Sequence, residues 1–465
     1  MPSFEPNTLA AWTGGRWTGP LAAAPVGFTA DSRRLSAGQA FVALRTSRRD
    51  GHDFLAAALN AGAACAIVSR PEPRVALAQL VVADPLAALQ AVAREHRRAF
   101  GGTVVGITGS AGKTSTKELL ALLLGGEAGG VLSTEGNLNN QIGVALTLTR
   151  LDPASHRFAV VEAGISAPGE MQVLARMIEP DIAVVTLVGP AHLEELGGLA
   201  GVAREKAVLA GAVRNAGACF FPAACAAYPE FQALAAAGST VVEPSLGRGA
   251  LEGRIRFAVS HTSEGTRVSM ATGTQAPFDV AMRRVSDGMA QNVALAVAAA
   301  LKIGVRSDEI QRRMLSWRAS PLRGEWRASE GRRLYLDCYN ANPASMADAL
   351  EAFFAMAPED EPRLLVIGCM EELGAESARY HLELGRSLAL RRGDHAVVVG
   401  GHAGAVRQGA LEGGCGADQV EVADAVEQVS MRLAGFRGSV FMKGSRRHEL
   451  ERALSGAEFA EAPHA

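Results

Sequence analysis

The sequence lacks the features that identify secreted, membrane-spanning or metal-cluster proteins. Its six cysteines are scattered and none belongs to a Cys-x-x-Cys pair, so their spacing indicates neither a zinc site nor a disulfide framework. The first residues lack the basic segment and apolar run of a signal peptide, and no uncharged apolar stretch is long enough to span a bilayer. We therefore expect a cytoplasmic protein without a transmembrane segment, whose thiols are reduced and mostly buried.

An excess of charge of either sign is also missing. The chain has 46 lysines and arginines against 48 aspartates and glutamates, which gives a formal net charge of −2. Because there is no global positive field, the composition does not favour a nucleic-acid partner. With 465 residues, of which 48% are hydrophobic, the chain is long enough for about three domains with sizeable cores.

Hydrophobic patterns divide the chain into three regions. In residues 1–100, the short apolar runs GQAFVAL and CAIVS predict strands on either side of a helix, and an amphipathic helix then leads to a pair of glycines. In residues 101–315, the near-continuous apolar runs TVVGIT, RFAVVEAG and PDIAVVTLVG predict parallel strands covered on both faces. The more polar RIRFAVSHTSEGTRVSMAT predicts an antiparallel excursion, and MAQNVALAVAAALKIG predicts a helix that ends at glycine.

The third region, residues 316–465, again alternates strand and helix patterns. The runs RLYLDCYN, RLLVIGCM, HAVVVGG and SVFMKGS predict a second sheet built from βαβ units. The expected fold class is therefore α/β with three domains. These are a small N-terminal α/β domain (1–100), a central parallel-sheet domain (101–315) and a C-terminal Rossmann-like α/β domain (316–465).

A glycine-rich segment, TGSAGKTS, joins the first strand of the central region to a helix. Backbone N–H groups in such a turn can point at phosphate oxygens, and the helix adds the positive end of its dipole. Gly109 and Gly112 allow close approach, Lys113 can reach the β- and γ-phosphates, and the Thr114 hydroxyl can hold Mg²⁺. Ile107 stands where the strict P-loop pattern has its first glycine. The strand before and the helix after still favour a P-loop over a glycine turn with a solvated lysine.

Polar residues follow the predicted strands, where doubly wound sheets bind their ligands. Each alone has an ordinary explanation as a helix cap, a surface turn or an Asx turn, but together they predict a site. A carboxylate such as Glu162 is a suitable Mg²⁺ ligand because hard cations prefer oxygen. The amides of GNLNNQIG (136–143) suit either turn formation or donation to phosphate and substrate oxygens. The strand-end residues are Glu162, His192, Asp337, Tyr339, Asn340, Asn342, Lys443, Gly444 and Ser445.

Over nearly its full length the chain resembles the Mur ligases, the ATP-dependent amide-forming enzymes of peptidoglycan assembly. DSRRLSAGQAFVAL and RDGHDFLAAALNAGA are similar to the domain that holds the uridine nucleotide. TGSAGKTSTKE, TEGNLNNQIG, VVEAGISAPGEM and GPAHLEELGGLAGVAREK are similar to the central ATPase domain, and DCYNANPASM, EELGAESARYH and KGSR to the C-terminal domain. YNANP is typical of the branch that adds D-alanyl-D-alanine, and the Asp-Asn-Pro-Arg motif of the diaminopimelate-adding branch is not found.

The resemblance implies a role for each matching position. The catalytic residues would be Lys113, Glu162, His192 and Lys206. Metal ligands would be Thr114, Glu162, His192 and Lys206, the lysine as a carbamate that acts like a further carboxylate. ATP would be bound by Gly109, Ser110, Gly112, Lys113, Thr114, Ser115, Asn292, Arg323, Asp337, Tyr339 and Asn340. Substrate would be bound by Asp31, Ser32, Arg33, Asp50, Gly51, His52, Thr134, Asn137, Asn139, Asn140, Lys443 and Ser445.

The resemblance also implies ATP and Mg²⁺, two ions of it, as cofactors. The substrates would be UDP-N-acetylmuramoyl-tripeptide and D-alanyl-D-alanine, and the enzyme would be a monomer. The γ-phosphoryl group of ATP would activate a carboxylate as an acyl phosphate, which the dipeptide amine then attacks. The three-domain layout suggests that the central and C-terminal domains close around the nucleotide.

Several positions depart from the family pattern and keep two alternatives open. One alternative is another Mur or folylpolyglutamate-type ligase, which would not be expected to carry YNANP. The other is a nucleotide-binding scaffold with weakened catalysis. For Lys206 the plain alternative is a solvated lysine on a charged helix face. The departures are Ala43-Leu44-Arg45-Thr46, Thr186-Leu187, Lys206-Ala207-Val208, Gly288 and Gly368-Cys369-Met370.

Overall fold

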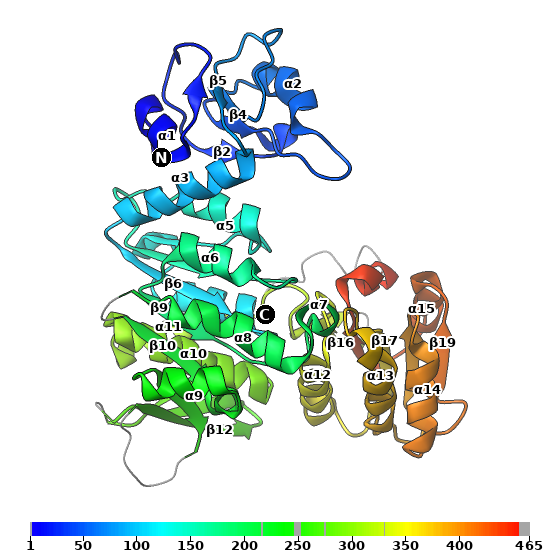
Figure 1. Ribbon diagram of the computed structural model, residues 1–465. Helices are drawn as coiled ribbons and strands as arrows, with labels where there is room; N and C mark the ends of the chain where they lie inside the picture. The colour runs from blue at the N-terminus through cyan, green and yellow to red at the C-terminus, as the bar shows by residue number, and fades with distance from the viewer. Residues whose placement is uncertain (1, 215–216, 246–252, 274–275, 330, 455–465) are drawn as a thin grey trace. The chain divides into compact units, whose positions relative to one another are not determined.

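The computed structural model describes residues 2–214, 217–245, 253–273, 276–329 and 331–454, and these contain three β-sheets (Figure 1). The chain separates into two compact units, which are described one at a time. The first comprises residues 1–108, 120–185 and 205–220, and the second comprises 109–119, 186–204 and 221–465. The α/β class and the three sheet-containing regions expected from the sequence are confirmed.

The first sheet has five strands in the order β1-β5-β4-β3-β2, of which only β1 is antiparallel to its neighbour. The apolar residues of GQAFVAL and CAIVS form β3 and β4, as predicted. They pack with the following helix around the fully buried Phe41 and Leu55. The strands are β1 Arg16–Trp17, β2 Phe28–Thr29, β3 Ala40–Val42, β4 Cys65–Val68 and β5 Gln79–Val81. The helices are α1 Pro6–Thr13, η1 Ser32–Arg34, η2 Gly51–Phe54, α2 Leu55–Asn60 and α3 Pro85–Ala99.

The second sheet has nine strands in the order β14-β13-β12-β11-β10-β9-β6-β8-β7. The central strands β6, β8 and β9 are parallel and almost wholly buried, as their continuous apolar runs predict. The predicted antiparallel excursion is the β12–β13 pair, which β14 extends. The strands are β6 Thr103–Thr108, β7 Val131–Ser133, β8 Phe158–Glu162, β9 Ile182–Val185, β10 Ala218–Pro222, β11 Thr240–Pro244, β12 Arg254–Thr262, β13 Gly265–Ala271 and β14 Phe278–Met282.

The helices of this region end where their sequences indicate. The predicted helix MAQNVALAVAAALKIG is α10, and it stops at Gly304, whose φ of +104° is left-handed and suits glycine. The helices are α4 Lys113–Leu123, η3 Glu127–Gly129, α5 Gln141–Leu148, α6 Glu170–Ile178, α7 Leu193–Leu196, α8 Leu199–Gly211, η4 Ala223–Ala227, α9 Pro229–Ala236, α10 Asp287–Ile303 and α11 Ser307–Met314.

The third sheet has six strands in the order β15-β16-β20-β17-β18-β19, all parallel except β15. Buried aliphatic residues from β16, β17, β18 and β20 form its core on the side of α15. Helices α12, α13 and α14 lie side by side on one face (Figure 1). The strands are β15 Glu325–Ser329, β16 Arg332–Asp337, β17 Arg363–Gly368, β18 His395–Val399, β19 Val420–Ala423 and β20 Gly438–Lys443. The helices are α12 Pro343–Met356, η5 Gly374–Glu376, α13 Ser377–Arg386, α14 Ala403–Glu412, α15 Val426–Leu433, η6 Arg446–His448 and η7 Leu450–Ala453.

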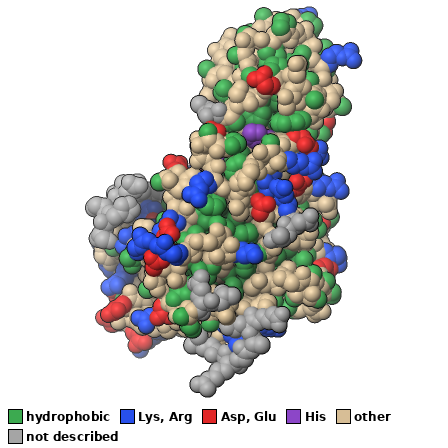
Figure 2. All heavy atoms as spheres, turned by 90° about the vertical axis from the view of Figure 1, so that its left-hand side faces the viewer, with side chains coloured by type: hydrophobic (Ala, Val, Ile, Leu, Met, Phe, Trp, Pro, Cys, Tyr) green, Lys and Arg blue, Asp and Glu red, His purple; other side chains and the backbone are tan. Residues whose placement is uncertain are grey.

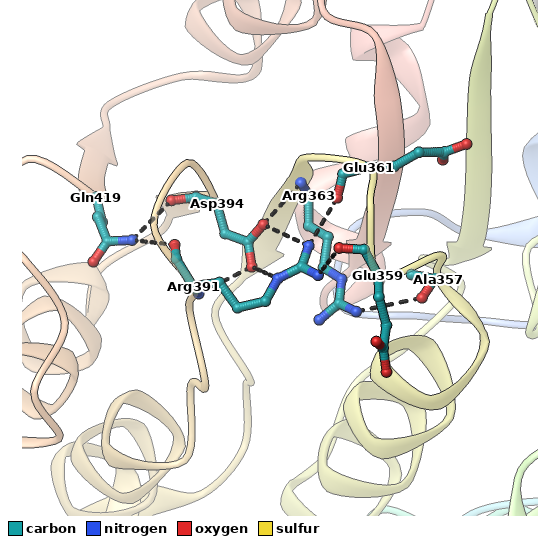
Figure 3. Close-up of polar contacts among 7 residues, drawn as sticks. All are labelled: Ala357, Glu359, Glu361, Arg363, Arg391, Asp394 and Gln419. Atoms are coloured by element: carbon teal, nitrogen blue, oxygen red, sulfur yellow. Dashed lines mark hydrogen bonds and ion pairs between the residues drawn. The ribbon is translucent and has the colours of Figure 1, made fainter.

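An ion pair between the buried Asp394 and the partly exposed Arg391 lies at the amino ends of β17 and β18 (Figure 3). The Arg391 guanidinium donates to both Asp394 carboxylate oxygens and to the carbonyls of Glu359 and Glu361. Asp394, 1% exposed, also accepts the backbone N–H of Arg363 at 3.1 Å. Because these groups bond to one another and to nearby backbone, we assign them a structural role, which is to hold the segments before β17 and β18 together.

Candidate active site

The phosphate loop lies between β6 and α4 and needs both of its glycines. Gly109 has φ +153°, and a Cβ there would collide with Thr186. Gly112 has φ +79°, and a Cβ there would lie 2.5 Å from the Asn292 amide nitrogen. Lys113 begins α4, and its Nζ donates to the Gly109 carbonyl at 2.8 Å. The loop therefore has the shape and the cation that a phosphate site requires.

The segment after β9 supports this loop through backbone groups. The Ser110 N–H donates to the Leu187 carbonyl at 2.8 Å, and the Ser110 hydroxyl donates to the Gly189 carbonyl at 2.8 Å. The Thr186 hydroxyl donates to the Ala111 carbonyl at 2.5 Å. Since Leu187 contributes its carbonyl, the departure from the family pattern at this position leaves that contact intact.

Glu162 ends β8 and is almost completely buried, with 1% of its surface exposed. Its register partner in β6 is Ile107, two residues before the phosphate loop begins. The Asn139 amide donates to Glu162 Oε1 at 2.7 Å, and the Thr134 hydroxyl accepts the Glu162 N–H at 2.9 Å. The structure thus brings three predicted site residues together and fixes the direction of the carboxylate.

The other two amides of the GNLNNQIG loop lie differently. Asn140 caps α5 by accepting the N–H groups of Ile142 and Gly143 at 3.1 and 2.9 Å. Asn137 is exposed. Helix capping accounts for Asn140, and a substrate role for either amide stays a prediction.

The predicted metal ligands occupy positions of different kinds. Thr114 lies buried in the first turn of α4, and His192 precedes α7 with its Nδ1 2.5 Å from Glu372 Oε2. Lys206, in α8, is only 3% exposed, so a solvated lysine on a charged helix face is wrong.

These donors suit a hard cation that keeps water and phosphate oxygens as further ligands. Among the described residues, no three or more His, Cys, Asp or Glu side chains are grouped so that they could hold a metal by themselves.

A second charged group lies at the carboxyl ends of β16 and β20. Asp337 and Lys443 are register partners, and their carboxylate and ammonium groups are 2.6 Å apart. The same ammonium donates to the Asn340 carbonyl at 3.0 Å. The Arg323 guanidinium stacks on the Tyr339 ring, 3.8 Å from its centroid. A flat cation over an aromatic ring offers a stacking surface.

The YNANP motif connects this group to the phosphate loop. Asn342 caps α12 in a capping box with Ser345, so part of its role is structural. Its side-chain N–H₂ also donates to the Ser110 carbonyl of the phosphate loop at 3.0 Å. Ser445, another predicted residue, is buried and donates its N–H to the Cys369 carbonyl at 3.4 Å.

The residues predicted for uridine-nucleotide binding form two short turns beside the first sheet. Asp31 caps η1 and pairs with Arg33, whose hydrogen bond lowers the Asp31 pKa to about 2. Asp50 caps η2, where the His52 backbone N–H is the main cause that lowers its pKa. A Cβ at Gly51 would lie 2.6 Å from the Ala43 backbone, so only glycine fits.

Four contacting residues were missed from the sequence. Arg70 pairs with Asp50 at 3.0 Å, Gln291 donates to the Thr186 carbonyl at 3.3 Å, and Glu372 pairs with His192. Asp348 accepts the Gly288 N–H at 2.8 Å. Sequence motifs do not indicate these residues, because each contacts a partner that is distant in the sequence.

Asp348 explains the departure at Gly288. A Cβ at Gly288 would lie 2.7 Å from an Asp348 carboxylate oxygen, so the carboxylate occupies the space of a side chain there. Burial raises the pKa of Asp348. The two positions are therefore complementary, and the glycine is not simply a lost side chain.

Surface and core agree with the composition. On the face drawn in Figure 2, basic and acidic side chains are interspersed. All six cysteines are buried and free. Within the described ranges, no helix combines the length and the apolar character needed to cross a membrane. Absence of a nucleic-acid partner and a monomeric state stay predictions.

Comparisons with known proteins find similarity over nearly the whole chain. The Mur ligase family catalytic domain matches residues 26–97, the Mur ligase middle domain 107–300, and the Mur ligase glutamate ligase domain 322–446. The Escherichia coli K12 UDP-N-acetylmuramoyl-tripeptide–D-alanyl-D-alanine ligase is 32% identical to this chain over 92% of both lengths. A crystal structure of MurF from Acinetobacter baumannii has a TM-score of 0.86 and 28% identity, covering 97% of this chain and 98% of that one. MurF ligase from Thermotoga maritima in complex with ADP has a TM-score of 0.78 and 27% identity, covering 92% and 96%.

Proposed function

The chain belongs to the Mur ligase family, and from this premise we propose that it joins D-alanyl-D-alanine to UDP-N-acetylmuramoyl-tripeptide at the expense of ATP. The observation that carries the proposal is the contact between Asn342 of YNANP and the Ser110 carbonyl of the phosphate loop. It connects the motif typical of the D-alanyl-D-alanine branch with the group expected to hold the triphosphate. The similarity to relatives of that name extends over nearly the whole chain.

The reaction has two steps. An oxygen of the tripeptide's terminal carboxylate attacks the γ-phosphorus of ATP, the bond to the bridging oxygen breaks, and ADP leaves. The dipeptide amine then attacks the acyl carbon, loses a proton, and expels inorganic phosphate. The free energy of ATP hydrolysis thus drives the formation of an acyl phosphate. Its phosphate is a good leaving group, whereas the oxygen of a free carboxylate is a poor one.

The chain's own residues would position and neutralise charge, which is the main requirement of phosphoryl transfer. Lys113 and the N–H groups of the loop would hold the β- and γ-phosphates. Asn292, Arg323 and Asp337 would hold the nucleoside, with Tyr339 and Asn340. Uridine would bind at the two turns that contain Asp31, Ser32, Arg33, Asp50, Gly51 and His52. The remaining substrate contacts would come from Thr134, Asn137, Asn139, Asn140, Lys443 and Ser445.

Mg²⁺ would be held by Thr114, Glu162, His192 and a carbamylated Lys206. When bound, the ions would neutralise the negative charge that develops on the phosphoryl oxygens. Glu162 is suited to this role because the Asn139 amide occupies one side of the carboxylate and holds it in one orientation. Lys206 is buried, with 3% of its surface exposed, and this supports a role inside the site over one on the solvent face of its helix. We place the reaction in the cytoplasm, with a single chain as the enzyme.

The test is the mass of the product after incubation with UDP-N-acetylmuramoyl-tripeptide, ATP, Mg²⁺ and D-alanyl-D-alanine. We expect a new amide, with one phosphate released per bond formed. A product formed only with a different amino acid would show a sister ligase. ATP binding without phosphate release under any condition would show a scaffold.

A further inference from the structure

The first turn of α10 is held by a carboxylate from α12. The first N–H groups of a helix have no carbonyl partner within it, and that of Gly288 donates to Asp348 Oδ1 at 2.8 Å. The Ser286 hydroxyl caps the same turn by accepting the Met289 N–H at 3.1 Å. Burial raises the pKa of Asp348, whereas hydrogen bonds from Ser286 and from the Gly288 N–H act in the opposite direction. Both groups of the turn therefore face the carboxylate.

The carboxylate also fills the space that a side chain at Gly288 would need. The three atoms outside α10 that are nearest to a Cβ built there all belong to Asp348, at 2.7, 2.9 and 3.0 Å. Gly288 lies in the regular first turn of α10, so the backbone itself would accept alanine. The contact between the two helices is thus what excludes a larger residue.

The helices α10 and α12 also contact the phosphate loop, each with an asparagine. From the start of α12, the Asn342 side chain donates to the Ser110 carbonyl at 3.0 Å. From α10, the Asn292 amide lies against Gly112, where a Cβ would be 2.5 Å from the amide nitrogen. Asp348 joins the two helices to each other, so the loop, α10 and α12 are connected in a closed set of three contacts.

Helix geometry relates the turn that Asp348 holds to Asn292. Gly288 and Asn292 are four residues apart, so they lie on the same face of α10. Each Cα–Cβ bond of a helix is tilted toward the N-terminus, and the Asn292 side chain therefore leans toward the turn of Gly288. A shift of that turn would move the Asn292 amide relative to Gly112.

We propose that Asp348 is a positioning residue for the nucleotide site, which holds the first turn of α10 so that Asn292 stays against the phosphate loop. The inference rests on the proposed function, because that function assigns Asn292 and the loop to ATP. Asp348 acts through the N-terminus of α10 and is not itself one of the proposed ATP ligands. Because the contact needs glycine in one helix and a carboxylate in the other, the effects of changing the two residues should be coupled.

Ordinary helix capping is the competing explanation. A carboxylate near a helix N-terminus stabilises the helix whichever segment supplies it. Asp287 provides the matched control, because it is a carboxylate in the same turn that belongs to α10 itself and pairs with His261 of β12 at 2.8 Å. If capping were the whole explanation, Asp287→Ala and Asp348→Ala would behave alike.

The experiment measures nucleotide binding separately from turnover and from folding. ADP is titrated into the full chain by isothermal calorimetry in the presence of Mg²⁺, and thermal unfolding is recorded without nucleotide. KM for ATP and kcat are measured on the same preparations. The variants are Asp348→Ala, Asp348→Asn, Asp287→Ala, Gly288→Ala and the double variant Gly288→Ala/Asp348→Ala.

We expect Asp348→Ala to weaken ADP binding about 10-fold, the loss expected for a hydrogen bond to a charged acceptor. KM for ATP should rise by a similar factor with little change in kcat, because Asp348 holds a helix and no reacting group. Asp348→Asn should lose less, since its amide oxygen still accepts the Gly288 N–H, and Asp287→Ala should lose nothing. Gly288→Ala should weaken binding because its methyl group meets the carboxylate, but it should cost nothing further in the Asp348→Ala background.

Unchanged ADP affinity in folded Asp348→Ala, or an equal loss in Asp287→Ala, would overturn the proposal. Additive losses in the double variant would overturn it too, because residues in contact are expected to couple. If Asp348→Ala does not fold, Gly288→Ala decides instead, and unchanged ADP affinity there would overturn the proposal. If the ADP affinities change as expected while the wild type makes no amide product, the positioning role stands and the proposed reaction is wrong.

Discussion

The two ends of the C-terminal sheet each contain an ion pair with one almost fully buried partner, but the surroundings of the two pairs differ. At the amino end, Arg391 and Asp394 bond to each other and to carbonyls of neighbouring loops, so the network is closed on itself (Figure 3). At the carboxyl end, Lys443 and Asp337 lie beside the stacked Arg323 and Tyr339. The same interaction thus stabilises loops at one end and accompanies a candidate site at the other, where parallel strands direct their ligands.

The nine-stranded sheet has the same asymmetry. Near its amino end, Arg97 is completely buried, pairs with Asp181 at 2.8 Å and donates to the carbonyls of Ile178 and Glu179. At the carboxyl ends, the phosphate loop follows β6 and Glu162 is the last residue of β8. Charge alone therefore does not identify a functional residue. The position of a charged residue relative to the strand direction and to glycine-rich turns is the better indicator.

The largest expected effect is on the phosphate loop. Lys113→Ala should lower ligation about 10³-fold, because the variant loses the cation that neutralises the triphosphate. Its melting temperature should stay close to that of the wild type, since the Lys113 side chain is partly exposed and its Nζ donates to a carbonyl of the loop and not to the sheet core. Phosphate release and thermal unfolding measured on the same preparation check both parts. Full turnover in this variant would contradict the assignment of the functional site to the carboxyl end of the nine-stranded sheet.

Lys206→Ala should lower ligation about 100-fold, because the variant loses a proposed metal ligand. Added formate or acetate should restore part of the rate, because a short carboxylate can take the place of the carbamate. Lys302→Ala, in the exposed last turn of α10, is the control and should change nothing. Normal ligation by Lys206→Ala at low bicarbonate would contradict the carbamate.

Asp394→Ala should affect stability and leave catalysis unchanged. Removal of the buried Asp394 carboxylate leaves the Arg363 N–H and the partly exposed Arg391 guanidinium without their acceptor, and such a loss costs about 1–3 kcal/mol of the free energy of unfolding. Denaturant unfolding together with kcat at a low temperature separates the two quantities. The exposed Asp418→Ala is the control. A large loss of kcat in fully folded Asp394→Ala would mean that the amino end also serves the reaction.

The smallest effect is expected at Asp50 in the first sheet region. Hydrogen bonds from His52 and Arg70 lower the Asp50 pKa in the folded chain, so its ionised form stabilises the fold. That contribution is present above the unfolded pKa of about 4 and is lost as the pH falls toward the lower folded value. Asp50→Asn should therefore be about 1 kcal/mol less stable than the wild type at pH 7. The difference should shrink at pH 3 in denaturant unfolding, and a constant gap would contradict the charge-based explanation.

Particular residues show how far the sequence could be interpreted. The strands around TGSAGKTS, the antiparallel β12–β13 pair and the stop of α10 at Gly304 follow from apolar periodicity and glycine placement. These signals are local, so they are visible in a short window of residues. The burial of Lys206, by contrast, cannot be predicted from a short window, because the segment AREKAV resembles an ordinary charged helix face.

The sequence by itself determined the α/β class, the order of the elements, the phosphate loop and the family, because each depends on neighbouring residues or on short motifs. Only the tertiary structure decided which distant side chains meet. His192 and Glu372 are separated by the rest of the central region and more than a third of the C-terminal one, and Gly288 is matched by Asp348 from another helix. Such contacts depend on how the chain packs over long sequence separations, and no local pattern encodes the partner.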